Sequence, residues 1–307
     1  MTVTVSLLKG EQPARPPVLA PSTGPGRRRP RAARLLGRVT VHIVLVSLCL
    51  AWLLPVVALL VNSFRPAYAV DTSGWWRALT VGFTERNYAE VLVGGMSTAM
   101  ANSLLIAVPA TVATVSTGAV TAYAFARMPF RGRGVLFVAL LALLVLPAQL
   151  ALVPLLRLYG TVHLSGSFLG IWLVHLGLAL PFATYLLRNF FAALPAEMFE
   201  AAALDGASAL ATFLRIALPT SLPALASLAI FDFVWIWNDL LLALVFLGGD
   251  RSVAPLTVAV SNLVSATTGQ GEELLAPAAF VSMSLPLLLF FGLQRYFVGG
   301  LLAGAVK

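Results

Sequence analysis

The chain has 307 residues, of which 59% are hydrophobic and only 10% are charged, and its mean hydropathy is +0.92. A soluble domain of this length needs far more charge to cover its surface, so the composition excludes a soluble globular protein and indicates a membrane-embedded one. A single cysteine excludes a disulfide framework, and the three histidines are scattered, so no metal site is expected.

The formal net charge of +8 reflects a cluster of Arg and Lys near the amino terminus. Residues 1–37 are also rich in Pro, Gly and Ala and lack apolar periodicity, so we expect a disordered cytoplasmic tail. Binding to RNA is one reading of such a tail. A topology signal beside a membrane span is favoured, and no nucleic-acid partner is expected. The apolar run after Arg38 is too long for a cleaved signal peptide and indicates a retained span.

Further along the chain, apolar stretches alternate with short polar segments. A helix needs about 20 mostly apolar residues to cross a bilayer. Six stretches meet this requirement, namely residues 39–61, 98–124, 134–156, 168–187, 222–247 and 276–298. They are too long and too uniformly apolar for barrel strands. The predicted fold is therefore all-α, a polytopic membrane protein in which residues 38–307 form the transmembrane domain.

The distribution of Lys and Arg predicts the orientation of these spans. If the amino terminus is cytoplasmic, most of the 20 basic residues fall in cytoplasmic segments. The short segment 126–133 weighs most, because it contains three arginines and short loops dominate the positive-inside rule. We therefore expect a multi-pass protein of the cytoplasmic membrane with both termini in the cytoplasm.

Residues 194–219, between the fourth and fifth predicted spans, differ from the other loops. The run that starts at Glu200 has high helix propensity and slim alanine side chains, so another surface can approach its backbone closely. Gly206 can take the left-handed conformation that ends a helix, with Asp205 just before it. A second short helix follows and is expected to stop at Pro219. A compact helical pair of this kind indicates a docking surface for a partner.

This loop resembles the EAA loop of permease subunits in binding-protein-dependent ABC importers. The residues that carry the resemblance are Glu200, Ala201, Ala202, Asp205, Gly206, Ala207, Phe213, Ile216 and Pro219. More narrowly, the chain is similar to the carbohydrate-uptake permeases related to MalG. Further matching pieces occur in order at 102–104, 122–133, 146–149, 154–156, 237–239 and 294–307.

The resemblance implies a type I ABC importer (MetI-like) permease fold with its core at 98–298. In that family the EAA loop is the coupling helix, which sits in a cleft on a nucleotide-binding subunit. Carried onto this chain, Glu200 would meet a basic residue of the ATPase, with Asp205 beside it, and Gly206 would allow the tight turn. Without the resemblance, a solvated acidic face would be the preferred interpretation of Glu200 and Asp205.

Two acidic residues fall in the predicted fifth span, Asp232 and Asp239, seven positions apart and so on one face of a continuous helix. Ionisable groups in a membrane usually face a bundle interior or a wet cavity. One reading is that Asp232, Trp237, Asn238 and Asp239 line the solute pathway, where polar groups bond sugar hydroxyls and the indole stacks on a sugar ring. The other reading is that they brace the bundle through interhelical hydrogen bonds. The sequence leaves both open.

The sequence contains no Walker A loop, no GxSxG elbow and no HExxH helix, so we expect no catalytic residues and no enzymatic activity in this chain. No cofactor is expected on it, and ATP is expected to be hydrolysed by a partner subunit. The resemblance implies three partners: a second, different permease subunit, a homodimeric ATPase, and an extracytoplasmic solute-binding protein that docks on residues 62–97 and 248–275. The glycine-containing carboxyl tail is expected to be extended and to reach the ATPase.

The solute implied by the resemblance is a sugar or oligosaccharide, with glycerol phosphate or a polyol as the alternative. An ion-coupled secondary transporter is the alternative class. Such a transporter usually has more spans and internal inverted repeats, neither of which is evident, and it would leave residues 194–219 unexplained.

Overall fold

The computed structural model describes residues 31–248, 250–263 and 272–305, and at 31–37, 71, 272 and 293–305 it describes the backbone alone. Within these ranges every regular element is a helix, as an all-α protein requires, and no strand occurs among them. The chain divides into two compact units, with the boundary between Leu54 and Pro55 inside the first helix. The larger unit contains both the loop 194–219 and the candidate pathway residues.

The first helix, α1 (Arg31–Ser63), contains the first predicted span. It begins earlier than expected, so residues 31–37 are helical and the predicted disordered tail is wrong for them. Residues 1–30 lie outside the described residues. The apolar part of α1, Arg38–Ser63, is long enough to cross a membrane.

A compact group of short helices follows, organised around Arg65, whose side chain is fully buried. Its guanidinium donates to the Asn62 side chain at 2.8 Å and to the Ser73 carbonyl at 2.9 Å. These bonds satisfy polar groups that would otherwise be buried without partners. The elements of this group are α2 (Ala67–Thr72), η1 (Trp75–Arg77), α3 (Ala78–Val81), α4 (Arg86–Val91) and η2 (Leu92–Met96).

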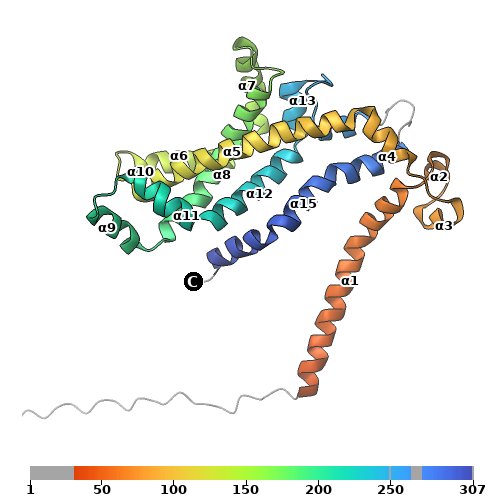
Figure 1. Ribbon diagram of the computed structural model, residues 1–307, viewed down its shortest axis with the longest axis horizontal. Coiled ribbons are helices and arrows are strands. Elements are labelled where there is room, and N and C mark those ends of the chain that lie inside the picture. Colours follow the sequence, from red (N-terminus) through yellow and green to blue (C-terminus); the bar gives the residue numbers. More distant parts are fainter. Residues whose placement is uncertain (1–30, 249, 264–271, 306–307) are drawn as a thin grey trace, which may run out of the picture. The chain divides into compact units, whose positions relative to one another are not determined.

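The most extensive helix pair is α5 (Ser97–Arg127) against α8 (Phe168–Ala193), which run side by side in Figure 1. Their backbones approach closely at Gly118, where an added Cβ would lie 2.8 Å from the Cβ of Ala183. One turn along, the hydroxyls of Thr121 and Thr184 are hydrogen-bonded at 2.8 Å. Small residues and hydroxyl pairs are what bring membrane helices together, because lipid provides no hydrophobic driving force between them.

The predicted third span is not one straight helix. It consists of α6 (Arg133–Val145) and α7 (Gln149–Thr161), which are bent by 103°. The bend falls at Pro147, and Leu146 before it is extended, with φ −75° and ψ 124°. A proline disfavours the helical conformation in the residue that precedes it, which accounts for the break.

The predicted fifth span is also divided. The helix α12 (Leu222–Trp237) ends well before residue 247, and α13 (Leu241–Leu247) begins after a three-residue break. At its other end, α12 is bent by 75° from the segment Ala209–Thr220. It packs against α5 and against the last helix, α15. A short helix, α14 (Leu256–Ser261), follows and contacts α5 and α15.

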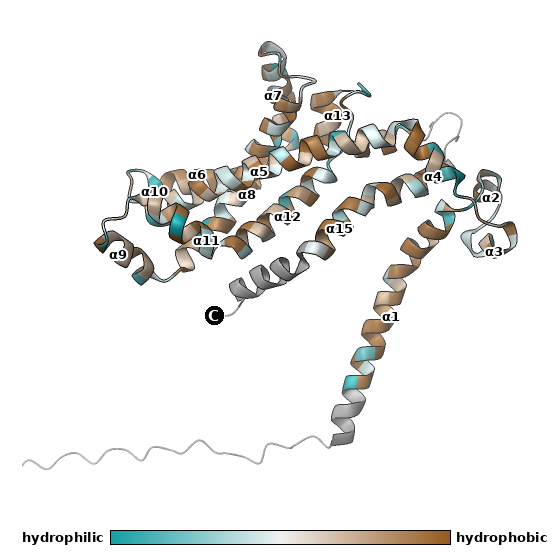
Figure 2. Ribbon diagram, in the orientation of Figure 1, coloured by the Kyte–Doolittle hydropathy of each residue, from teal (hydrophilic) through white to brown (hydrophobic). Residues whose placement is uncertain are grey.

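The last helix, α15 (Glu272–Ala305), continues through the glycines of the carboxyl tail. The expected extended tail is therefore wrong up to Ala305, because the helix that precedes it simply propagates. Among the described residues four helices are long and apolar enough to cross a membrane, or up to six if each bent pair is one span. Six is the predicted number, although the second bent pair, Ala209–Thr220 with α12, begins earlier and ends earlier than the predicted span 222–247. Figure 2 shows hydrophobic residues along α6, α12 and α15.

Buried side chains form two hydrophobic clusters in the larger unit. The first cluster includes Ile106, Ile171, Trp237, Phe246 and Leu256. The second cluster includes Tyr123, Leu187, Phe191, Phe213 and Leu228. Because α5 and α8 supply residues to both clusters, this helix pair connects the candidate pathway residues to the loop 194–219.

Gly118→Ala is expected to destabilise the protein by about 1–3 kcal/mol, because its Cβ overpacks the α5–α8 contact. Gly177→Ala is the matched control, since Gly177 is an exposed helical glycine on α8 with no atom within 4 Å of an added Cβ. Unfolding temperatures of the purified variants in detergent measure the difference. Equal temperatures for the two variants would contradict the close approach.

Candidate functional site

The loop 194–219 begins with α9 (Ala196–Leu204), as the sequence predicts. Pro195 precedes the helix with φ −56°, and its fixed ring directs the chain into the first turn. Glu197 lies in that first turn, where a carboxylate interacts favourably with the positive end of the helix. Glu197 and Glu200 are both exposed, so this helix presents carboxylates to its surroundings.

The turn after α9 is closed by Gly206, which has a φ of +73°. The Gly206 N–H donates to the Ala203 carbonyl at 3.1 Å, and the Ala207 N–H donates to the Ala202 carbonyl at 2.9 Å. This pair of bonds is a Schellman motif, with Asp205 at the helix end, and the left-handed conformation predicted for Gly206 is confirmed. An added Cβ at Gly206 would meet no atom within 4 Å, so the constraint on this position is conformational rather than spatial.

The second helix of the loop is built from α10 (Ala209–Thr212), a π-helical turn η3 (Phe213–Ala217) and α11 (Leu218–Thr220). Ser208 caps it, since its hydroxyl accepts the Ala211 N–H at 3.2 Å. The sequence reasoning missed this cap, although a serine just before a helix is a recognisable signal. The helix ends at Thr220 rather than at Pro219, so the expected stop at Pro219 is wrong by one residue.

A groove of about 430 Å³ separates the two helices of the loop. Its α9 side is formed by Met198, Ala201, Ala202 and Asp205, and its other side by Ala207, Ala211, Arg215 and Ile216. Several predicted loop residues therefore line one groove. The exposed side chains of Glu200 and Pro219 lie outside its lining, as do Gly206 and Phe213.

Two exposed leucines flank the turn between the helices. Leu204 is 89% exposed and Leu210 is 65% exposed. The sequence reasoning missed both, although a leucine directly before the Asp205–Gly206 turn is a visible signal in a loop outside the spans. Large apolar side chains exposed in a loop outside the predicted spans indicate a surface that another molecule covers.

Phe213 has a different role, because it is buried rather than exposed. Its ring centroid lies 5.0 Å from that of Tyr123 on α5 and 6.4 Å from that of Phe191 on α8. Aromatic pairs at these separations add to the stabilisation from burial alone. Phe213 therefore anchors the loop to the bundle, whereas Leu204 and Leu210 remain exposed.

The candidate pathway residues lie near the end of α12, and two of them are buried. Asp232 is 3% exposed, and its carboxyl lies beside the Thr114 hydroxyl of α5. Trp237 is 2% exposed, and its indole N–H donates to the Ser282 carbonyl of α15 at 3.0 Å. The proposed stacking of Trp237 on a sugar ring is therefore wrong in this arrangement, because the indole braces α12 against α15. Asn238 is exposed.

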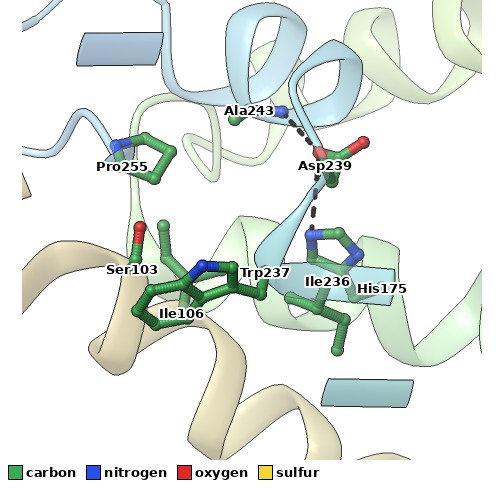
Figure 3. Close-up of a pocket in the computed structure, with 8 residues that line it drawn as sticks. All are labelled: Ser103, Ile106, His175, Ile236, Trp237, Asp239, Ala243 and Pro255. Atoms are coloured by element: carbon green, nitrogen blue, oxygen red, sulfur yellow. Dashed lines mark hydrogen bonds and ion pairs between the residues drawn. The ribbon is translucent and has the colours of Figure 1, made fainter. Parts of the chain in front are cut away.

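Asp239 is not on one helix face with Asp232, because α12 ends at Trp237 and Asp239 lies in the break. Its carboxylate caps α13 and accepts the Leu242 N–H at 3.3 Å and the Ala243 N–H at 3.0 Å. His175 on α8, one of the three scattered histidines, is buried with Nε2 4.0 Å from the Asp239 Oδ2 (Figure 3). A break in the helix ladder thus brings two polar side chains together.

Figure 3 shows Ser103 on the same small cavity as His175 and Asp239. The cavity has a volume of about 10 Å³, which is roughly the space of one water molecule. In this arrangement it is too small for a sugar. Among the described residues no group of three or more His, Cys, Asp or Glu side chains could hold a metal ion.

The segment after α13 is held by the start of α5. The Asn102 amide donates to the Ser252 carbonyl at 2.9 Å and to the Ala254 carbonyl at 3.1 Å. The Ser103 hydroxyl accepts the Leu256 N–H at 2.8 Å. Two neighbouring side chains of α5 therefore fix the chain from Ser252 to Leu256.

Asp239→Ala is expected to lower stability by about 1–2 kcal/mol, because it removes both acceptors from the start of α13. Asp239→Asn is the matched variant, since its amide oxygen can still accept one N–H and the side-chain volume is nearly unchanged. Unfolding temperatures in detergent distinguish the two. An Asp239→Ala protein as stable as Asp239→Asn would show that the capping bonds contribute nothing.

Comparison with known proteins identifies the family. Residues 114–302 match the family described as "Binding-protein-dependent transport system inner membrane component". A permease protein for uptake of osmoprotective compounds from Synechocystis sp. is 48% identical over 88% of this chain and 92% of its own length. The alpha-glucoside transport system permease protein of Rhizobium meliloti is 50% identical over 73% of this chain, and the match spans 60% of that protein.

The fold has a solved counterpart. A chain of a bacterial ABC transporter involved in the import of the acidic polysaccharide alginate matches with a TM-score of 0.73 and 24% identity, over 87% of this chain and 98% of that chain. Permeases of this family associate with an ATPase and a solute-binding protein and are not themselves enzymes. With more than half of its residues matched, this chain belongs to the inner membrane components of binding-protein-dependent transport systems and is a multi-pass permease subunit of an ABC importer.

Proposed function

We propose that residues 194–219 are the coupling loop of this permease, on which a separate homodimeric ATPase docks. The observation that carries the proposal is the exposed turn at Gly206, flanked by Leu204 and Leu210 beside the groove between the two helices. A partner that covers the leucines would bury apolar surface that is otherwise left in water. The matched family region includes this loop.

Charge supports the choice of contacts. Glu197, Glu200 and Asp205 are exposed on the loop, and Glu200 would meet a basic residue of the ATPase. Charged pairs at an interface favour correct docking and suppress wrong partners. ATP would be bound and hydrolysed by the partner, since the chain carries no Walker A sequence, and no cofactor would bind to this subunit.

The proposed assembly pairs this chain with a second, different permease subunit, each providing half of the solute pathway. A solute-binding protein would dock on the opposite side of the membrane from the coupling loop. Because the ATPase is cytoplasmic, docking on residues 194–219 requires that loop to be cytoplasmic. With six spans this orientation puts both termini in the cytoplasm, which agrees with the basic segment 126–133.

The proposed solute is a neutral sugar, oligosaccharide or glycoside. The two relatives above are named for osmoprotective compounds and for alpha-glucosides. Asp232 is buried and Asp239 lines a cavity too small for a sugar in this arrangement. In a conformation that opens them to the pathway, these carboxylates would repel a phosphate and accept hydrogen bonds from hydroxyls. A neutral polyhydroxylated solute therefore fits these side chains better than glycerol phosphate does.

Gly206→Val is expected to reduce recovery of the ATPase by about fivefold or more when this chain is purified in mild detergent, because a β-branched residue at positive φ stores about 1–3 kcal/mol of strain. Gly206→Asn is the matched control, since asparagine tolerates the left-handed conformation and an added Cβ meets nothing at this position. Mass spectrometry identifies the co-purified chains.

Wild type and Gly206→Asn should retain the ATPase and a second permease subunit. Glu200→Lys should weaken ATPase recovery without affecting the fold, because that side chain is exposed. If the ATPase is recovered equally with wild type, Gly206→Val and Glu200→Lys, the proposed coupling loop is contradicted. Absence of an ATPase from the wild-type preparation would contradict the cytoplasmic placement of the loop as well.

Uptake by the reconstituted importer tests the solute and the pathway together. Labelled alpha-glucoside is expected to enter, and glycerol 3-phosphate is not expected to compete with it.

Asp239→Asn should lower uptake about tenfold if the carboxylate bonds solute hydroxyls, since hydrogen bonds to charged groups contribute about 1.5–3 kcal/mol. Unchanged uptake by a stable Asp239→Asn protein would restrict Asp239 to capping α13.

A further inference from the structure

Arg127, the last residue of α5, joins three helices at the base of the coupling loop. Its Nε and Nη2 atoms donate to the Phe191 carbonyl at 3.1 Å and 2.7 Å, and Nη2 also donates to the Leu194 carbonyl at 2.7 Å. These carbonyls belong to the end of α8, which has no basic residue in its own last turn. The guanidinium therefore supplies hydrogen bonds and positive charge that this helix end lacks.

The same guanidinium also contacts the coupling loop. Its Cζ lies 4.0 Å from the ring centroid of Phe199, which is on α9. Arg127 thus binds the end of α8 through its N–H groups and the first loop helix through its planar face. A lysine cannot reproduce this arrangement, because an ammonium lacks both the fork of donors and the flat face.

One turn earlier on α5, Tyr123 contacts the other half of the loop. Its ring centroid lies 5.0 Å from that of Phe213 in the second loop helix. Residues four apart lie on one helix face, so Tyr123 and Arg127 form a continuous strip on α5. This strip holds both helices of the coupling loop, the first through Phe199 and the second through Phe213.

The other end of α5 holds the segment Ser252–Leu256 through Asn102 and Ser103. The distance along the helix from Ser103 to Arg127 is about 36 Å, from a rise of roughly 1.5 Å per residue. One helix therefore contacts the coupling loop at one end and, at the other, a segment near the candidate pathway.

We propose that Arg127 is the positioning residue that transmits movement of the coupling loop to α5 and α8. The inference rests on the proposed docking of an ATPase on this loop. Arg127 does not belong to the exposed surface formed by Glu200, Leu204 and Leu210. Its loss should therefore leave the ATPase docked and uncouple ATP hydrolysis from the spans.

The test uses the complete importer, with its binding protein and solute, in proteoliposomes. Arg127→Gln and Arg127→Lys are compared with Arg131→Gln, which removes a charge from an exposed position in the same short segment. Three quantities are measured: recovery of the ATPase, uptake, and the ratio of ATP hydrolysis with and without loaded binding protein. A second variant, Phe199→Leu, removes the ring contact without touching the arginine.

For both Arg127 variants, recovery of the ATPase is expected to match wild type, while uptake and the stimulation ratio fall about tenfold, a loss of roughly 1.4 kcal/mol. Phe199→Leu should lower the ratio of ATP hydrolysis with and without loaded binding protein by about threefold. Arg131→Gln should match wild type in all three quantities. The inference would be overturned if the Arg127 variants keep the wild-type ratio of ATP hydrolysis with and without loaded binding protein. It would also be overturned if the ATPase is no longer recovered with either the Arg127 variants or Phe199→Leu. Failure of wild type to recover any ATPase would instead overturn the proposed function on which it rests.

Discussion

The close contact between α5 and α8 at Gly118 is the packing on which the larger unit depends. Two helices in lipid gain little from burying apolar surface, so they associate where small side chains let their backbones approach. Gly118 and Ala183 provide that contact, and the Thr121–Thr184 hydrogen bond adds a polar one. With the two helices held together, the end of α5 lies beside the end of α8, where the loop 194–219 begins.

Helix breaks in this protein occur where local groups replace the lost backbone hydrogen bonds. At Asp239, within the predicted fifth span, this replacement is a requirement because lipid offers no alternative partner, whereas the turn at Gly206 lies outside the predicted spans. Asp239 accepts the first N–H groups of α13, and the Schellman bonds at Gly206 satisfy the last carbonyls of α9. The two breaks also coincide with the two candidate sites, since a chain that leaves the helix exposes groups able to bind a partner or a solute.

Within the loop 194–219, the side chains that contact the bundle differ from the exposed ones, to which the proposed function assigns docking. Phe213 and Phe199 face the bundle and contact Tyr123 and Arg127, whereas Leu204 and the carboxylates are exposed. Under the proposed function, an ATPase would bind the exposed surface of the loop while the opposite surface remains attached to the spans. The hydrogen bonds at the Gly206 turn and the contacts at the base would then carry a displacement of the loop to the bundle.

The sequence by itself determined the features that depend on local chemistry. Apolar runs predicted the number of spans but not the bends in the third and fifth. Gly206 predicted the left-handed end of α9, because a residue without a Cβ takes that conformation at the lowest cost. Tertiary structure decided what depends on neighbours distant in the chain. Packing between helices decided that Trp237 bonds to α15, that Asp239 lies near His175, and that Phe213 is buried. The sequence could not predict these contacts, because periodicity within one helix carries no information about its neighbours.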